Sequence, residues 1–584
     1  MHRNLRTFID ALRRENEIVE ISAEVDPCLE IAEIHRRVIA QQGKALLFTN
    51  VKGSSFPVVS NLFGTVKRID LAFGKRPLEF VKRAVEVAES LLPPTLGKLW
   101  GFRDIGRSGM KIGTRSVGNA PVLEKRQSAV DLEAIPFLQL WHEDGGYFNT
   151  LPLVYTESAA TGKHNLGIYR MQRYDTATTG MHWQIGKGGG FHYFEAEQRN
   201  ESLPVTVFLG GPPALMLSAV APLPEGAPEL MLASLLAGEK IGMAESSTGS
   251  HKLIAEAEFA LVGHVPPFER KPEGPFGDHY GYYSLQHDYP VFHADAVFHR
   301  KDAIYPATVV GKPRQEDFYI GDYLQELLSP LFPVVMPTVR DLWSYGETGF
   351  HSLAAAVVQE RYGREALSAG FRILGEGQLT LTKFLLLTDR LQNLRDFKSL
   401  FEHILERTEW QRDLHIFSQT AFDTLDYASG KVNYGSKAIL MGTGEAKREL
   451  TRKFRGDLPN GIERIEIFCG GCLVIKGPSY EVEKNLGERI ARSGAFDDWQ
   501  IVVLHDDAEV AKATDKFLWA TWTRFDPAND IYAREVSLKN NHIGYTSPIV
   551  IDARMKPWYP KEVVVRDDIA KMVDRRWSEY FGSS

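Results

Sequence analysis

Residues 355–413 align without a gap with the stretch that lies 117 residues further along the chain. The apolar run 384–387 falls on 501–504, and Asp413 falls on Asp530. The patterns of strand, helix, strand and helix coincide in one register, which indicates a duplicated unit. A chain that carries such a repeat must fold its C-terminal half as two similar α/β layers. We expect the first copy in residues 311–455 and the second copy, with a C-terminal tail, in residues 456–584.

The rest of the 584-residue chain is expected to form further domains, because a single hydrophobic core does not grow to this size. Residues 1–115 combine amphipathic helix patterns with short strands, which predicts a small N-terminal α/β unit. Residues 116–310 carry short apolar runs separated by Gly and Pro clusters, which favours an antiparallel β-sheet or barrel. The fold class expected for the whole chain is α/β in the mixed (α+β) sense.

The charge balance excludes one class of function. The chain has 68 basic and 75 acidic residues, a net charge of −7, whereas nucleic-acid binders usually carry a basic excess. Three cysteines are too few for a disulfide scaffold and fit a reducing compartment. No apolar run approaches the ~18 residues of a membrane span, and no leader pattern is visible. We therefore expect a soluble, cytoplasmic protein with no membrane span.

The segment 273–283 is the richest in groups that can do chemistry. Glu273 and Asp278 flank a Gly-Pro turn that can fold both carboxylates toward one cavity. Two carboxylates in unlike environments can divide into a fixed anion and a proton donor. The alternative is an acidic surface turn with aromatic packing.

Arg170 lies in a second informative segment, residues 165–172. In an extended strand it shares a face with Leu166 and Ile168. An arginine on an apolar face needs a carboxylate or phosphate partner, because an unpaired buried charge is costly. The alternative is a strand-edge arginine that points into water.

Four weaker patterns suggest a function but can also be explained by local structure alone. The glycine-rich run 186–190 could bind an anion, but it matches neither the P-loop nor the dinucleotide spacing. Residues 435–437 could meet a phosphate, but most such triplets are turns. A metal site at one strand face or an alternating edge strand accounts for His293, Asp295 and His299. Cys469 and Cys472 have redox-motif spacing, but a strand follows them, so they read as small core residues.

Taken together, these segments resemble the UbiD family of decarboxylases, which use prenylated FMN. The matching parts keep the family's order and spacing to about residue 445, and they are residues 165–172, 222–225 with Glu229, 273–283 and 425–437. The long form and residues 44–51 are most similar to the quinone-pathway and aromatic-acid branches. The resemblance implies that the central domain is a split β-barrel that binds the flavin.

The resemblance also implies a catalytic triad of Arg170, Glu273 and Asp278. Arg170 would orient the substrate carboxylate beside the cofactor, Glu273 would hold Arg170, and Asp278 would protonate the carbon after CO₂ departs. Such a donor needs a raised pKa, which we expect for a carboxyl group in an aromatic-walled pocket. Tyr280, Tyr282 and Tyr283 would help to form these walls.

Further residues of the family's cofactor site can be placed on this chain by the resemblance. The cofactor-binding set would be Asn165, Ile168, Arg170, Lys187, Ala219, Ala221, Pro222, Glu229 and Lys437. Lys437 would meet the flavin phosphate, and Asn165 and Glu229 would bind Mn²⁺ (or Mg²⁺), with K⁺ nearby. The chain departs from the family at Gly186, where a histidine metal ligand is usual; His182 and His192 are the candidates to replace it.

The implied function is reversible, non-oxidative decarboxylation of an aromatic or α,β-unsaturated acid, with a phenolic or quinone-precursor acid favoured. The implied partners are the acid, CO₂, a flavin prenyltransferase that supplies the cofactor, and further copies of the chain in a homo-oligomer. The first C-terminal copy would serve the active site, and the second would be an assembly surface or a lid support. The alternatives are an FMN- or metal-dependent enzyme of another class, or a non-catalytic relative.

Overall fold

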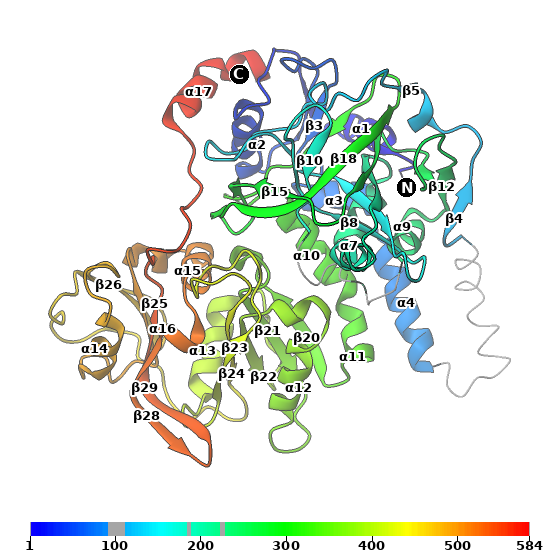
Figure 1. The fold of residues 1–584 in the computed structure, drawn as a ribbon. Helices are drawn as coiled ribbons and strands as arrows, with labels where there is room; N and C mark the ends of the chain where they lie inside the picture. Colours follow the sequence, from blue (N-terminus) through cyan, green and yellow to red (C-terminus); the bar gives the residue numbers. More distant parts are fainter. Residues whose placement is uncertain are drawn as a thin grey trace. The chain divides into compact units, whose positions relative to one another are not determined.

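A computed structural model describes residues 2–90, 111–183, 188–221, 223, 228–312 and 314–582. The chain forms two compact units, one made of Met1–Leu327 with Lys561–Ser584 and the other of Leu328–Pro560. Both units contain helices and strands (Figure 1). The boundaries expected near residues 115 and 455 fall inside these units.

The N-terminal part of the first unit is a small α/β layer. Its four-stranded sheet has the order β1-β2-β3-β19. The strands are β1 (Ile18–Ile21), β2 (Ala45–Phe48), β3 (Val58–Ser60) and β19 (Tyr305–Pro306). The helices are α1 (Leu5–Arg14), α2 (Glu30–Ala40), α3 (Val66–Phe73), α4 (Arg76–Ser90), α10 (Glu316–Leu328) and the C-terminal α17 (Asp567–Phe581). Helix α17 returns to this layer, where Tyr580 donates a 2.5 Å hydrogen bond to Glu30 of α2.

An eight-stranded antiparallel sheet forms the centre of the first unit. Its order is β10-β18-β14-β11-β7-β8, and β15 and β5 also pair with β18. The strands are β5 (Lys125–Arg126), β7 (Leu153–Glu157), β8 (His164–Ile168), β10 (Thr178–Gly180), β11 (Leu203–Leu209), β14 (Phe259–Val265), β15 (Arg270–Glu273) and β18 (His287–His299). The mixed α/β class is confirmed, but within the described ranges the end strands β8 and β10 do not pair to close a barrel.

Shorter elements frame this sheet. The helices are α7 (Gly188–Gln198), α8 (Pro213–Val220) and α9 (Glu229–Ala237). The strands are β4 (Thr114–Ser116), β6 (Phe148–Asn149), β9 (Met171–Gln172), β12 (Ile241–Ala244), β13 (Leu253–Ile254), β16 (Phe276–Gly277) and β17 (Tyr283–Ser284). Apolar residues of the central sheet and of the N-terminal layer share one core, in which Phe48, Val207 and Leu261 are fully buried.

The second unit contains two five-stranded sheets of identical topology, which confirms the duplication. The orders are β20-β21-β22-β24-β23 and β25-β26-β27-β29-β28, each with three central parallel strands and antiparallel edges. The first sheet consists of β20 (Val339–Ser344), β21 (Leu353–Val358), β22 (Phe384–Thr388), β23 (Leu414–Thr420) and β24 (Gly435–Met441). The second consists of β25 (Arg464–Cys469), β26 (Cys472–Lys476), β27 (Ile501–His505), β28 (Ile531–Lys539) and β29 (His542–Asp552). The helices are α11 (Phe332–Val335), α12 (Glu365–Leu374), α13 (Phe397–Arg407), α14 (Leu486–Arg492), α15 (Thr514–Trp522) and α16 (Pro527–Asp530).

The strand register corrects the gap-free alignment of the two copies. The separation of 117 residues holds from Phe384 to Asp413. In the first copy the Glu409 N–H donates to Asp413 at 2.9 Å, and in the second copy the equivalent Asp526 N–H donates to Asp530 at 2.7 Å. At β21, however, Leu353 pairs with Phe384 while Cys472 pairs with Ile501. Cys472 therefore corresponds to Leu353 and not to Ala355. A shift of two residues keeps every side chain on its face, so the apolar pattern does not reveal it.

Helices cover both faces of the first sheet of the second unit. Ala355 and Val357 pack with residues of α13, whereas Ala354 and Ala356 pack with residues of α12. The α13 core continues into the second copy and includes Cys472. Cys469 and Cys472 are buried free thiols paired across β25 and β26, which agrees with their interpretation as core residues.

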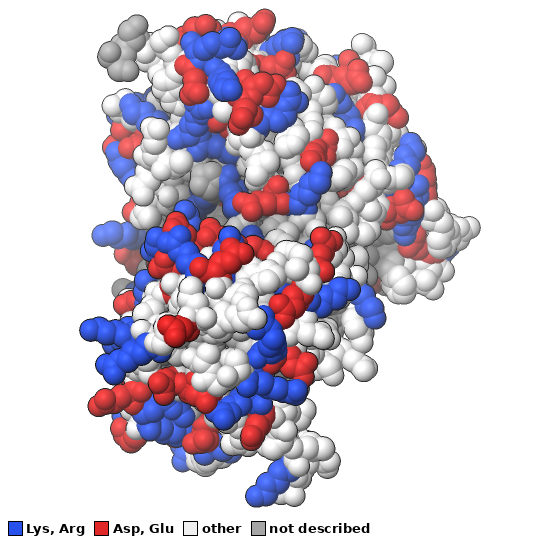
Figure 2. All heavy atoms as spheres, turned by 90° about the vertical axis from the view of Figure 1, so that its left-hand side faces the viewer, with Lys and Arg blue, Asp and Glu red and all other residues white. Residues whose placement is uncertain are grey.

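The surface drawn in Figure 2 intersperses positive and negative side chains, with neither sign forming a continuous field. Such a surface does not steer a polyanion. Among the residues that the structure describes, no helix combines the length and apolar character that a bilayer crossing requires.

Candidate active site

The structure brings Arg170, Glu273 and Asp278 together in the first unit. The Arg170 Nε–H donates to Glu273 Oε1 at 2.8 Å, and Nη2 donates to Glu273 Oε2 at 3.1 Å. The remaining nitrogen, Nη1, donates to Asp278 Oδ2. All three residues are buried. The carboxylate partner that Arg170 requires is therefore a pair of carboxylates.

Strand ends and loop contacts position this cluster. Glu273 ends β15, Asp278 follows β16, and the loop between them is anchored at two amides. The Gly274 N–H donates to Gln172 Oε1 (2.7 Å), and the Gly277 N–H donates to Asp144 Oδ1 (2.8 Å). A Cβ on Gly277 would lie 2.1 Å from the Trp141 ring, so this close approach needs glycine.

Asp144 and Gln172 are residues that the sequence analysis missed. Asp144 also accepts from the backbone amides of Leu140 and Trp141, at 2.9 and 2.8 Å. Burial raises the pKa of Asp144 to about 7. Since Asp144 serves the backbone of the loop, its role is to hold the loop that presents Asp278.

An aromatic ring packs against the triad. The Arg170 guanidinium lies over the Phe276 ring, 4.7 Å from its centroid. Tyr280, Tyr282 and Tyr283, which were expected to form the walls of the pocket, are buried. Ser284 completes the arginine's contacts, because its Oγ accepts from Nη2 at 2.9 Å.

Each carboxylate of the triad also meets a histidine. His182 Nδ1 donates to Glu273 Oε2 at 3.0 Å, and His279 Nδ1 donates to Asp278 Oδ1 at 2.7 Å. His182 was proposed only as a metal ligand, and the structure instead commits it to Glu273. Its other ring nitrogen, Nε2, is buried and has no hydrogen-bond partner among the described residues. No spacing signal marks His182, whereas His279 directly follows Asp278.

The charges of the cluster decide its protonation. Burial alone would lower the pKa of Arg170, but the charges of Glu273 and Asp278 raise it above its ordinary value. Burial would raise the pKa of Glu273, yet Arg170 and then His182 lower it to about 2. The pKa of Asp278 also falls below its ordinary value, because the His279 hydrogen bond and the Arg170 charge outweigh burial. The expectation of a raised pKa for Asp278 is therefore wrong for this arrangement.

Several of the expected cofactor residues gather around β8. Asn165 lies in β8, and Glu229 begins α9 and accepts from the Leu166 N–H at 3.1 Å. A Cβ on Gly188 would lie 2.1 Å from Asn165 Oδ1, so α7 approaches this strand as only glycine allows. Ile168 ends β8. Ala219 and Ala221 lie at the end of α8. Lys187, Pro222 and Gly186 lie outside the described residues.

Orphaned polar atoms show that this region suits a polar ligand. Within the part of the chain that the structure describes, the buried Trp183 Nε1 has no acceptor and the buried His182 Nε2 has no hydrogen-bond partner. A Cβ on Gly189 would lie 2.6 Å from Trp183 Nε1, so the backbone comes close to the indole. A ligand with both donors and acceptors would satisfy these atoms. The residues present therefore fit a flavin-like group.

Lys437 belongs to the second unit, where it lies near the start of β24 in a buried ionic cluster. Its Nζ donates to the Thr382 carbonyl at 2.9 Å, and the neighbouring Lys383 pairs with Asp426 at 2.7 Å. Burial lowers the pKa of Lys437 to about 8, against the opposing charges of Asp426 and Asp423. An added anion would restore the ordinary pKa of this ammonium group.

The second copy lacks this cluster. In the first copy the Ala438 N–H donates to the Lys383 carbonyl at 2.8 Å. The equivalent bond of the second copy runs from the Ile549 N–H to the Gln500 carbonyl at 3.0 Å. Gln500 therefore stands where Lys383 stands, and Pro548 precedes Ile549 where Lys437 precedes Ala438. Only the first copy keeps two lysines at this edge of its sheet.

His293, Asp295 and His299 do not form a metal site. His293 lies 2.9 Å from Glu269, Asp295 lies 3.0 Å from His264, and His299 bonds to a backbone carbonyl. Within the described ranges no group of three or more His, Cys, Asp or Glu side chains could hold a metal ion.

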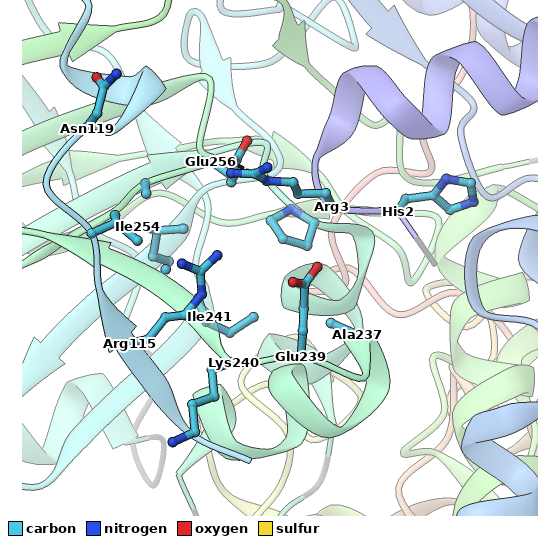
Figure 3. A pocket seen from close by; sticks show the side chains of 14 residues that line it. His2, Arg3, Arg115, Asn119, Ala237, Glu239, Lys240, Ile241, Ile254 and Glu256 are labelled. Atoms are coloured by element: carbon cyan, nitrogen blue, oxygen red, sulfur yellow. Dashed lines mark hydrogen bonds and ion pairs between the residues drawn. The ribbon is translucent and has the colours of Figure 1, made fainter. Parts of the chain in front are cut away.

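A small pocket at the N-terminus lies among other residues. Figure 3 shows Arg3 beside Glu256 there, with Arg115 and Glu239 directed toward the enclosed space. Its volume is about 40 Å³, enough for a few water molecules but too small for an aromatic acid. None of the expected site residues lines it.

Comparisons with known proteins agree with this geometry. Three models of the family described as 3-octaprenyl-4-hydroxybenzoate carboxy-lyase match the chain: its N-terminal domain at residues 9–88, its Rift-related domain at 115–313 and its C-terminal domain at 318–442. They span more than half of the chain, and the second copy lies beyond them.

Relatives and solved structures extend the match. A Chlamydia pneumoniae protein, named as one of the subunits of 4-hydroxybenzoate decarboxylase, is 50% identical over 582 residues, 99% of this chain and 98% of that one. Sedimentibacter hydroxybenzoicus vanillic acid decarboxylase has a TM-score of 0.67 at 22% identity, over 79% of this chain and 97% of that one. The UbiD-class enzyme HmfF from Pelotomaculum thermopropionicum, in complex with FMN, has a TM-score of 0.62 at 23% identity, over 78% of this chain and 98% of that one. The domain models and the full-length relative show that the chain belongs to the UbiD family, a family of carboxy-lyases.

Proposed function

We propose that the protein catalyses the reversible decarboxylation of a phenolic aromatic acid with prenylated FMN. The observation that carries this proposal is Arg170, held by both oxygens of Glu273 and bonded to Asp278 through its remaining nitrogen. Bound prenylated FMN would supply the electron sink that protein side chains lack. The side chains of the triad would orient the acid and move the proton.

Arg170 would bind the substrate carboxylate. Glu273 occupies the Nε and Nη2 edge of the guanidinium, so an incoming carboxylate would compete with Asp278 at Nη1. The added negative charge, together with loss of the Arg170 contact, would raise the pKa of Asp278. Asp278 would thus accept a proton only when substrate is present.

Asp278 would then serve the reacting carbon. The bond between the ring carbon and the carboxylate carbon breaks, CO₂ leaves, and the ring carbon takes the proton of Asp278. In the reverse direction the Asp278 carboxylate removes the ring proton. Buried Phe276, Tyr280 and Tyr283 would keep water from competing for this carbon.

The cofactor would be held by the residues that the family resemblance implies. Its phosphate would meet Lys437, and the residues proposed to hold the rest are Asn165, Ile168, Arg170, Lys187, Ala219, Ala221, Pro222 and Glu229. Mn²⁺ or Mg²⁺ would bind Asn165 and Glu229, with K⁺ nearby. A flavin prenyltransferase would supply the cofactor in the cytoplasm.

His192 is the better replacement for the metal ligand missing at Gly186. His182 is committed to Glu273 (3.0 Å), whereas His192 Nδ1 lies 2.9 Å from Thr156 Oγ1. Thr156 pairs directly with Asn165 across β7 and β8, and such cross-strand partners share a face. His192 therefore contacts the side of the sheet on which Asn165 lies.

A phenolic substrate is favoured by two relatives, whose names specify 4-hydroxybenzoate and vanillic acid. The second C-terminal copy lies outside the family models and lacks the lysine pair. We assign it a structural role, either as an assembly surface in a homo-oligomer or as a lid support.

The test is production of the protein in cells that also express a flavin prenyltransferase. The purified protein should show the absorption of prenylated FMN and release CO₂ from 4-hydroxybenzoate or vanillate more readily than from cinnamate. Protein that carries the cofactor but releases CO₂ from none of these acids would overturn the proposal. Plain FMN or metal alone in the active protein would indicate another class of enzyme.

A further inference from the structure

Each decarboxylation consumes one proton at carbon, so Asp278 must be recharged in every turnover. Asp278 is poorly placed to collect protons itself, because only 12% of its side chain is exposed and Arg170, at 8%, covers its other oxygen. A second group must connect this carboxylate to water. Such a group needs a titratable side chain that touches Asp278 and also reaches solvent.

His279 has both properties. Its Nδ1–H donates to Asp278 Oδ1 at 2.7 Å, and its own backbone N–H donates to the same oxygen at 2.7 Å. The backbone contact fixes the oxygen toward the ring, while 27% of the His279 side chain is exposed. Histidine is the side chain best suited to gain and lose a proton near neutral pH.

A second carboxylate acts on the same imidazole. Asp317 lies in the first turn of α10, and no described residue forms a hydrogen bond with its buried Oδ1. Burial raises the pKa of Asp317 to about 6, and the charge of His279 opposes this rise. The groups that face His279 include Asp278, with Arg170 behind it, Asp317 from α10, and the Tyr280 ring at 5.1 Å.

We propose that His279 carries protons between solvent and Asp278, and that Asp317 is a positioning residue that favours the charged form of the imidazole. This inference rests on the proposed function, in which Asp278 protonates the substrate carbon. The His279 imidazolium gives its Nδ1 proton to Asp278, and the neutral ring then regains a proton from water. The proton passes from Asp278 to the carbon that has lost CO₂, which restores the Asp278 anion.

The kinetic test compares His279→Ala with His142→Ala. His142 is a matched control, since 24% of its side chain is exposed and it makes no contact with Asp278 that the structure records. With the cofactor loaded, His279→Ala should lower kcat about 10- to 100-fold and change KM less than about twofold. Added imidazole should restore kcat in His279→Ala, and His142→Ala should behave as wild type.

An equilibrium test needs no turnover. The imidazole resonance of His279, assigned by its absence in His279→Ala, reports the pKa of the ring by NMR titration. Asp278→Asn and Asp317→Asn should each lower this pKa by about one unit, because each removes a negative charge near the ring.

The outcomes separate the two proposals. Loaded wild type that releases no CO₂ would overturn the proposed function, while the NMR titration still decides whether His279 is coupled to both carboxylates. An unchanged His279 pKa in both Asn variants would overturn the relay. So would a His279→Ala enzyme with wild-type kcat, or one that imidazole fails to rescue.

Discussion

Two buried arginines of this protein are clamped by carboxylates, yet their surroundings differ. Arg170 in the first unit donates to Glu273 through Nε and Nη2, and Arg554 in the second copy donates to Asp552 in the same way, at 2.9 and 2.7 Å. The third nitrogen of Arg554 donates to the Pro478 and Glu483 carbonyls. That of Arg170 instead meets a second carboxylate, Asp278.

The charge balance of the two clusters follows from this difference. In the second copy Lys556 pairs with Asp530 at 3.1 Å, so two cations face two anions and the network is closed. Around Arg170 two carboxylates face one permanent cation, and a histidine approaches each carboxylate. A closed neutral network stabilises a fold, whereas an unbalanced one responds to an added anion or proton. The comparison separates a cluster suited to stabilising the fold from the one proposed to be catalytic.

The largest effect is expected at the unbalanced cluster. Asp278→Asn should lower CO₂ release about 10³-fold, because an amide cannot deliver the proton. The melting temperature should change little, since the amide oxygen can still accept from Arg170. Steady-state CO₂ release and thermal unfolding of the same preparation measure both quantities. A variant that keeps a tenth of wild-type activity would remove Asp278 from the proton-donor role.

At the closed cluster the expected effect is on stability. Arg554→Met leaves Asp552 buried without its partner and should lower the free energy of unfolding by about 3–5 kcal/mol. Adding Asp552→Leu removes the stranded charge and should recover most of this loss. Urea unfolding measures the change, and activity per folded molecule should remain that of wild type. Lost activity in a folded Arg554→Met protein would break the distinction between the clusters.

The clusters should also respond to pH with opposite signs. Arg170 lowers the pKa of Glu273 to about 2, so its stabilisation is complete above pH ~4.5 and is lost as pH falls toward 2. Burial raises the pKa of Asp530 to about 6 despite Lys556, so its contribution becomes less favourable as pH rises from about 4 to 6. Each effect should amount to a few kcal/mol or less.

Unfolding free energies between pH 2 and 7 test these slopes. Glu273→Gln should flatten the acid limb relative to wild type, and Asp530→Asn should flatten the decline between about pH 4 and 6. Equal slopes in wild type and Glu273→Gln would mean that Arg170 does not hold this carboxylate in the folded state.

The smallest effect is expected for Ser284→Ala. Its Oγ accepts from Arg170 Nη2 at 2.9 Å, so the substitution removes one hydrogen bond to a charged group but leaves the carboxylate clamp. Such a bond contributes about 1–2 kcal/mol, or a five- to thirtyfold lower kcat/KM. Ser284→Thr keeps a hydroxyl and is the matched control. A kcat/KM equal to wild type in Ser284→Ala would show that Glu273 alone orients Arg170.

The duplication and the strand pattern could be predicted from the sequence, because both depend on apolar periodicity, which is a local property. The register at β21 could not be predicted, because the two extra residues of the first copy leave every side chain on its original face. Arg170, Glu273 and Asp278 could be singled out as candidates because each breaks a local pattern: a cation on an apolar strand, and carboxylates around a Gly-Pro turn.

Long-range contacts account for what the sequence analysis missed. His182 reaches Glu273 only because β10 pairs with β18, which in turn pairs with β15, and no spacing encodes this. The pKa of Asp278 was misjudged because burial was counted without the His279 and Arg170 contacts, which decide its sign. Asp144 holds the loop that carries Asp278 from a distance of 133 residues in sequence.

The central claim is that Asp278, set against Arg170 and Glu273, exchanges a proton with a ring carbon. Hydrogen–deuterium exchange measures this step directly: the cofactor-loaded protein is incubated in D₂O with the phenol formed from its substrate acid, and ring deuteration is followed by NMR. Wild type should deuterate the carbon that carries the carboxylate in the acid, and loaded Asp278→Asn should not. Exchange at the wild-type rate in loaded Asp278→Asn, or none in loaded wild type that releases CO₂, would contradict the account.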